Sequence, residues 1–243
     1  MTGVRGLVLH LWRTYPGTIG LAVVVVAVSL VGLFSPAVVS TFDREPTLIL
    51  HGQWWRILTQ LLVQREGWVQ FVVNVAGLVI LGTAVERRTG RAALLLSFFA
   101  AGVGAAVLLV FLQPRLVDAG TSNAVAGILG LLAVFWSRGD GQSPLVPYLY
   151  SVFFVSYLAA IDIAPLGITI AIACVLTGVL ASIRLMSRSR VSAVLLVVTV
   201  TTAAAVLCLQ HDGHGFGLAI GLAIGTGVTV HARYRRAVAT VTT

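Results

Sequence analysis

The sequence predicts an all-α membrane protein, a polytopic helix bundle with about eight transmembrane helices. Hydrophobic residues make up 58% of the chain and charged residues only 10%, whereas soluble globular domains carry roughly 25% charged residues. The mean hydropathy is +1.00, and the few charges are separated by long apolar stretches. Because lipid offers the backbone no hydrogen-bond partner, helices are the expected spanning structure.

The spacing of the charges defines the spans, since a helix needs about 20 apolar residues to cross the hydrocarbon core. The first apolar run is too long for a cleavable signal peptide, so it is expected to remain as the first helix. We expect a cytoplasmic N-terminal segment at 1–16, a transmembrane domain at 17–231 and a cytoplasmic tail at 232–243. The expected spans are 17–39, 68–84, 92–112, 121–137, 145–161, 164–183, 191–210 and 214–230.

The arginines predict the orientation of these spans, because short cytoplasmic loops collect positive charge. An inside N-terminus leaves only four arginines outside, and both termini are then cytoplasmic in a multi-pass protein of the cell membrane. The net charge of +8 is spread over several membrane ends rather than along one face, which argues against a nucleic-acid partner. The four outside arginines are Arg44, Arg56, Arg65 and Arg115.

A long segment, residues 40–67, separates the first two spans and contains the run His51-Gly52-Gln53-Trp54-Trp55-Arg56. Tryptophan favours the headgroup level of a bilayer. The segment is too long for a hairpin turn and too aromatic for a disordered linker. We therefore expect it to lie at the outer membrane interface.

Two distant fragments each place one potentially catalytic side chain at the start of a span. Ser122 begins the span at 121–137, and His214 begins the span at 214–230. Both spans run from outside to inside, so the two side chains are expected at the same membrane face. A hydroxyl becomes a good nucleophile when an adjacent base takes its proton. Each residue alone also has a simpler interpretation: Ser122 as a packing residue and His214 as a solvated interfacial histidine.

The last span carries glycine at every fourth position, which makes a smooth stripe on one helical face. Another helix is expected to approach this stripe closely. The glycines are Gly213, Gly217, Gly221 and Gly225.

Five motifs, in order along the chain, resemble those of the rhomboid family of intramembrane serine proteases. Trp55-Arg56 resembles the family's Trp-Arg pair, and Gln70 to Asn74 falls where rhomboids have His-x-x-x-Asn. The run from Gly82 to Gly90 resembles the inner end of that helix. Gly120-Thr121-Ser122-Asn123 occupies the place of the family's Gly-x-Ser-Gly motif. His214 to Gly221 fits the His-x-x-Gly-x-x-x-Gly motif of the family's last helix.

The resemblance implies a rhomboid-like fold and a hydrolase mechanism. Ser122 is then the nucleophile and His214 its general base. The oxyanion is expected to be held by the Ser122 backbone N–H and the Asn74 side chain, with the Gln70 amide as a further donor. No acid in the sequence obviously orients the histidine, and rhomboids similarly lack one. The implied partners are the lipid bilayer and transmembrane protein substrates or clients, with no cofactor and no metal.

The chain departs from the family pattern at several positions, which leaves an inactive, client-binding protein as the alternative. Asn123 replaces a glycine, Ala126 replaces a common aromatic residue and Gln70 replaces a histidine. Three spans, rather than one, separate Ser122 from His214. In a variant interpretation the span at 164–183 is the family's last helix, and the histidine is missing from it.

Two further alternatives are weaker. His211 is a rival base one turn before His214, but it lacks glycines at the offsets of the motif. A small-solute transporter is disfavoured because no span holds a central charged residue.

Overall fold

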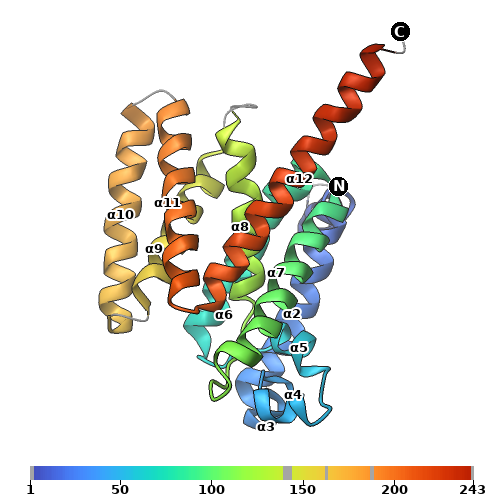
Figure 1. Ribbon diagram of the computed structural model, residues 1–243, viewed down its shortest axis with the longest axis vertical. Coiled ribbons are helices and arrows are strands. Elements are labelled where there is room, and N and C mark those ends of the chain that lie inside the picture. Colours follow the sequence, from blue (N-terminus) through green and yellow to red (C-terminus); the bar gives the residue numbers. More distant parts are fainter. Residues whose placement is uncertain (1–2, 139–143, 162–163, 187–188, 242–243) are drawn as a thin grey trace.

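The computed structural model describes residues 3–138, 144–161, 164–186 and 189–241, and these ranges form a bundle of helices (Figure 1). Within them there is no strand, only an isolated bridge between Arg44 and Asp118. The all-α prediction is confirmed. Each expected span corresponds to one helix: α2 (Pro16–Phe34), α6 (Trp68–Thr89), α7 (Arg91–Leu112), α8 (Ser122–Ser137), α9 (Leu145–Ile161), α10 (Leu166–Met186), α11 (Ser189–Leu209) and α12 (Gly213–Val241).

Six of these helices are long and apolar enough to cross a membrane, and α8 and α9 are shorter apolar helices of 16 and 17 residues. The chain is therefore a multi-pass membrane protein. Helix α8 is buried along almost its whole length. It occupies the centre of the bundle, where neighbouring helices rather than lipid surround it (Figure 1).

The first span ends earlier than expected. It was predicted to reach residue 39, but α2 stops at Phe34 and a short helix, α3 (Pro36–Phe42), follows. Ser35, between them, is extended with φ −135° and ψ 95°. The ring of Pro36 causes this break, because proline disfavours helical conformation in the residue before it.

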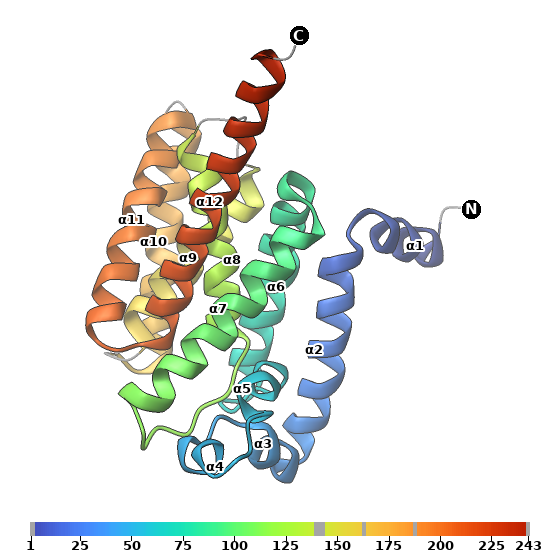
Figure 2. The same ribbon diagram turned by 45° about the vertical axis from the view of Figure 1, so that its right-hand side comes forward.

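The segment at 40–67 is built from short helices rather than irregular loop. Besides the end of α3 it contains α4 (Pro46–Leu50), α5 (Arg56–Thr59) and a 3₁₀ turn, η1 (Gln60–Leu62). Trp54 and Trp55 are exposed there. At the opposite end of the bundle, α1 (Val4–Thr14) turns away from the start of α2 (Figure 2).

Arg56, the arginine of the Trp-Arg pair, holds this segment together from inside. Its Nη1 donates to the Asp43 carboxylate at 2.8 Å, to the Ser40 carbonyl at 2.9 Å and to the Asp43 carbonyl at 3.0 Å. Its Nε donates to the Gln53 side chain at 2.7 Å. Because both Arg56 and Asp43 are buried, each needs the other to compensate its lost hydration.

Helices α8 and α12 touch through their backbones, as the glycine stripe predicts. A Cβ atom placed on Gly217 or Gly221 would overlap the carbonyl oxygen of Asn123 or Gly127, respectively. From the other side, a Cβ atom on Gly130 would overlap the Leu218 carbonyl. Only glycine permits this approach. It places the first turn of α12 beside the first turn of α8.

The helix that lies against α8 is thus α12 and not α10. Helix α10 packs on α9 and α11 at the edge of the bundle (Figure 1), and most of its side chains are exposed. In the variant interpretation, the span at 164–183 corresponds to the last helix of the rhomboid family. That interpretation would place α10 against α8, whereas α12 packs there.

Replacing Gly221 with alanine is expected to force α12 away from α8, because the new methyl group would meet the Gly127 backbone. Overpacking of this kind costs about 1–3 kcal/mol, so thermal unfolding in detergent should occur at a lower temperature. Gly227 is a matched control on the same helix, since a Cβ atom there meets no atom within 4 Å. Equal stability of the Gly221→Ala and Gly227→Ala proteins would contradict the close helix contact.

Candidate active site

Ser122 is the first residue of α8, and the segment before it is tied to the 40–67 segment. The Gly120 N–H donates to the Gln60 carbonyl at 3.0 Å, and the Thr121 hydroxyl donates to the Leu61 carbonyl at 2.8 Å. Further along, Arg44 and Asp118 exchange two backbone hydrogen bonds of 2.7 and 3.2 Å. These bonds fix where the Ser122 hydroxyl emerges from the helix.

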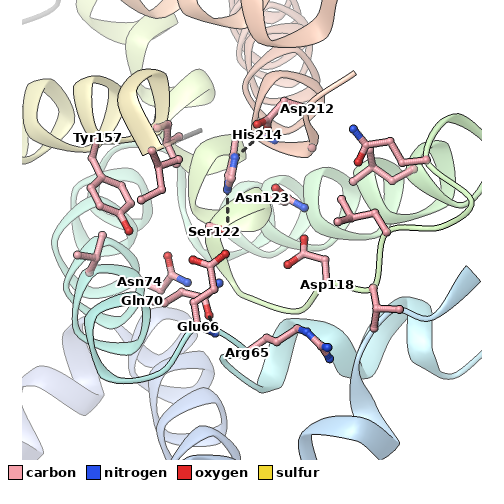
Figure 3. Close-up of a pocket in the computed structure, with 18 residues that line it drawn as sticks. Arg65, Glu66, Gln70, Asn74, Asp118, Ser122, Asn123, Tyr157, Asp212 and His214 are labelled. Carbon is pink, nitrogen blue, oxygen red and sulfur yellow. Dashed lines mark hydrogen bonds and ion pairs between the residues drawn. The ribbon is translucent and has the colours of Figure 1, made fainter. Parts of the chain in front are cut away.

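The structure brings Ser122 and His214 together across 92 positions of sequence. Ser122 Oγ lies 2.9 Å from His214 Nε2 (Figure 3). This is the distance of a hydrogen bond between a nucleophile and its base. His211, the rival, is exposed in the turn between α11 and α12 with a φ of 59°. It does not line the cavity that contains Ser122.

An acid lies beside the histidine, although no acid in the sequence obviously orients it. Asp212 Oδ1 lies 2.8 Å from His214 Nδ1, on the side of the ring opposite Ser122 (Figure 3). The same oxygen accepts a 2.6 Å hydrogen bond from the His214 backbone N–H, as the N-cap of α12 would. The sequence signal that could have indicated this contact is an aspartate, Asp212, directly before the first residue of a helix. Its capping geometry places the carboxylate beside the second helical residue.

A cavity of about 490 Å³ surrounds the Ser122–His214 pair. Its lining comes from the 40–67 segment, α6, α7, the segment before α8, and the start of α12. Helix α9, one of the helices between Ser122 and His214 in sequence, also contributes. Among the described residues no group of His, Cys, Asp or Glu has an arrangement that would hold a metal ion. The α9 residues that line the cavity are Tyr157, Leu158 and Ile161.

Asn74 and Gln70, the expected oxyanion donors, both line this cavity. Asn74 Nδ2 donates one hydrogen bond of 2.7 Å to Gln64 Oε1. Gln70 Nε2 donates to the Ala119 carbonyl at 3.0 Å, and its Oε1 accepts from the Glu66 N–H at 3.0 Å. Each amide nitrogen carries two hydrogens, so each keeps a second N–H beyond the bond described.

Gln64 connects Asn74 to a buried polar network that the sequence did not reveal. Its Nε2 donates to Thr121 Oγ1 at 2.9 Å and to Ser29 Oγ at 3.2 Å. Ser29 in turn donates to the Leu62 carbonyl at 2.8 Å. The network joins α2, the 40–67 segment, α6 and the residue before Ser122. It fixes the orientation of the Asn74 amide.

The lining of the cavity is mainly acidic in its charged residues. Besides Asp212 the cavity is lined by Glu66 and Asp118, whereas Arg65 is the only arginine of the lining and binds Asp43 at 2.5 Å. Glu66 is an exposed residue, yet partial desolvation by the surrounding protein raises the pKa of its carboxyl group. Asp118 adds to this rise and His214 opposes it. Three carboxyl groups thus line the cavity, and Asp212 is the one in contact with the imidazole.

The departures from the family pattern have local packing explanations. The side chain of Asn123 is buried against Gly213, where a Cβ atom would approach Asn123 Nδ2 to 2.8 Å. The Asn123 amide therefore lies between the two helix starts. Ala126 is buried where α12 approaches, with its Cβ 3.2 Å from the Cβ position of Gly217. A larger side chain there would separate the helices.

Comparison with known proteins identifies similarity over the same region. The Rhomboid domain model matches residues 51–186, more than half of the chain. The match includes Ser122 and ends before His214. The chain is 37% identical to the rhomboid protease GluP of Bacillus subtilis over 89 residues, which cover 37% of this chain and 17% of GluP.

A second B. subtilis protein, YdcA, also carries rhomboid protease in its name. It is 27% identical over 84 residues, 34% of this chain and 42% of YdcA. The matched region thus spans less than half of either relative. No solved structure matches the chain.

Replacing Gln64 with leucine is expected to destabilise the protein, because Asn74 Nδ2 loses its buried acceptor while Thr121 and Ser29 lose a donor. Leaving a buried polar group unsatisfied costs about 1–3 kcal/mol. Thermal unfolding in detergent measures the effect. Gln113→Leu is the control, since the Gln113 side chain makes no hydrogen bond within the described residues. A Gln64→Leu protein as stable as this control would contradict the network.

Proposed function

Because this chain belongs to the rhomboid family, we propose that it is an intramembrane serine endopeptidase that uses Ser122 and His214. The observation that carries the proposal is the 2.9 Å separation of Ser122 Oγ from His214 Nε2 inside a polar cavity. Three carboxyl groups and four side-chain amides line that cavity, so it provides water with binding sites. Water is the second substrate of a hydrolase.

In the proposed mechanism, His214 Nε2 takes the proton of the Ser122 hydroxyl as Oγ attacks the carbonyl carbon of the scissile peptide bond. The Ser122 backbone N–H and the second N–H of Asn74 stabilise the oxyanion. The protonated imidazole then gives its proton to the leaving amine, and an acyl-enzyme remains. Water, deprotonated by the same imidazole, hydrolyses the ester and restores the serine.

Asp212 has the role of a positioning residue in this scheme. A carboxylate beside Nδ1 favours the tautomer with hydrogen on Nδ1, which leaves the Nε2 lone pair directed at Ser122. The 2.8 Å contact between Asp212 Oδ1 and His214 Nδ1 supports this role. The carboxylate also stabilises the imidazolium that forms when the serine proton is transferred.

The proposed substrates are transmembrane proteins cleaved near the outer membrane face. Both reacting side chains stand at the beginnings of their helices, at the end of the bundle where the 40–67 segment lies. The arginine distribution supports cytoplasmic termini, and the cavity would then open toward the outside. Substrate backbone at the end of a transmembrane segment can reach Ser122 without crossing the bilayer core.

A second candidate function is binding of transmembrane clients without cleavage. It is favoured by one specific observation: the family match ends at residue 186, so the histidine comes from a helix beyond the matched region. The two candidates differ in whether Ser122 reacts.

Labelling with a fluorophosphonate probe distinguishes the two candidates. Wild-type protein in detergent should be labelled at Ser122, and Ser122→Ala should lose at least about 99% of the labelling, since activation of the hydroxyl by a base is specific to that residue. Ser182→Ala, on the exposed side of α10, should be labelled like the wild type. A folded wild-type protein that remains unlabelled would favour client binding.

The substitution Asp212→Asn should lower the cleavage rate of a reconstituted transmembrane substrate by about 10²–10⁴-fold, because the amide no longer favours the productive tautomer. The change is expected in kcat rather than KM, since Asp212 acts through His214. Glu45→Gln, in the 40–67 segment outside the cavity, is the matched control. A wild-type rate in Asp212→Asn would remove the positioning role while leaving the serine mechanism in place.

A further inference from the structure

A second cavity lies between α2 and α7, separate from the one that contains Ser122. Its volume is about 450 Å³, and apart from a single arginine its side chains are apolar. Val24 and Phe99 on its walls are 49% and 39% exposed, so the cavity opens sideways, toward the lipid. Its lining residues are Pro16, Gly17, Gly20, Leu21, Val24, Val25, Leu62, Arg91, Leu95, Phe98 and Phe99.

The single charged residue of the cavity, Arg91, lies at one of its ends. Arg91 is the first residue of α7, and Pro16 and Gly17 are the first residues of α2. Both helices therefore begin at the charged end (Figure 2). The lining continues along α7 to Phe99, roughly 12 Å deeper at 1.5 Å per residue, and is apolar throughout. A cation at the membrane surface thus leads into an apolar groove that runs parallel to the helices.

The charge of Arg91 is not compensated by the nearby carboxylate. Glu86 accepts hydrogen bonds from the Gly17 N–H and the Thr18 N–H, both at 2.8 Å, and from the Thr18 hydroxyl at 2.7 Å. Its negative charge thus caps the N-terminus of α2. Arg91 is exposed and forms no ion pair within the described part of the chain.

We propose that this groove binds one glycerophospholipid with an anionic headgroup. Its phosphate lies at Arg91, and one acyl chain follows α2 and α7 toward Leu62. Basic pockets between transmembrane helices bind anionic headgroups, and the surrounding lipid supplies the ligand at high concentration. The cation at one end of the groove favours an anionic lipid over a transmembrane helix of another protein, whose apolar face would not need it. The inference does not depend on the proposed protease activity.

Native mass spectrometry of the full chain tests this site. Protein in detergent is titrated with phosphatidylglycerol and, in parallel, with phosphatidylcholine of the same acyl chains. We expect one tightly retained phosphatidylglycerol. Arg91→Gln should weaken it about fivefold, the contribution of one arginine near an anionic headgroup, and should change the binding of phosphatidylcholine less, because the choline cation offsets the charge of its phosphate. Gly20→Leu should lose the retained lipid, because a Cβ atom at Gly20 meets no protein atom within 4 Å and the leucine side chain would extend into the groove, which Gly20 lines.

Two matched substitutions control for general effects. Arg87→Gln removes an exposed arginine from the same end of the bundle outside the groove, and Gly178→Leu adds the same side chain at an open position on α10. Both should retain the lipid, and thermal unfolding verifies that all variants are folded. Equal losses in Arg91→Gln and Arg87→Gln, equal retention of the two lipids by the wild type, or unchanged retention in Gly20→Leu would each overturn the proposal.

Discussion

The backbone contact between α8 and α12 is the constraint on which the rest of the site depends. Glycines at 217 and 221 on α12 and at 130 on α8 leave no room for a Cβ atom toward the partner helix. Without hydrophobic force between helices in lipid, such close packing is a main source of association. It also sets the register. Because the glycine stripe of α12 packs against α8, the first turns of the two helices lie side by side. His214, the second residue of α12, therefore lies beside Ser122, the first residue of α8.

A second set of interactions fixes the other side of the site. The 40–67 segment is held by the buried Arg56–Asp43 pair and binds the segment before Ser122 through backbone hydrogen bonds. The Gln64 network then joins the same segment to Asn74 and α2. Ser122, His214 and Asn74 come from three helices, yet each is positioned by more than one neighbour. The helices between Ser122 and His214 in sequence do not disturb this arrangement, because α10 lies at the edge while α9 adds a wall to the cavity.

Much of this architecture was predictable because a membrane restricts the possibilities. The intervals between charges located the eight long apolar helices, α2 and α6 to α12, and the glycine period in the last span predicted its contact with α8. Contacts formed only in three dimensions were not predictable. Gln64 meets residues 29, 74 and 121, which no local pattern connects. The contact of Asp212 with His214 was not predictable either, because it depends on the N-cap geometry of α12, and the first residue of that helix had to be known. Pro36 explains why α2 ends at Phe34. This local signal was overlooked because the apolar run continues without a charge past the proline.

The central claim is that α12 supplies the base for Ser122 although two additional helices precede it. The most direct measurement uses an isocoumarin inhibitor that acylates a serine and then alkylates a neighbouring imidazole. Peptide mapping of the inactivated protein should find the peptide with Ser122 joined through the inhibitor to the peptide with His214, since Oγ and Nε2 are 2.9 Å apart. A second bond to another residue, or an acylated serine other than Ser122, would contradict the account.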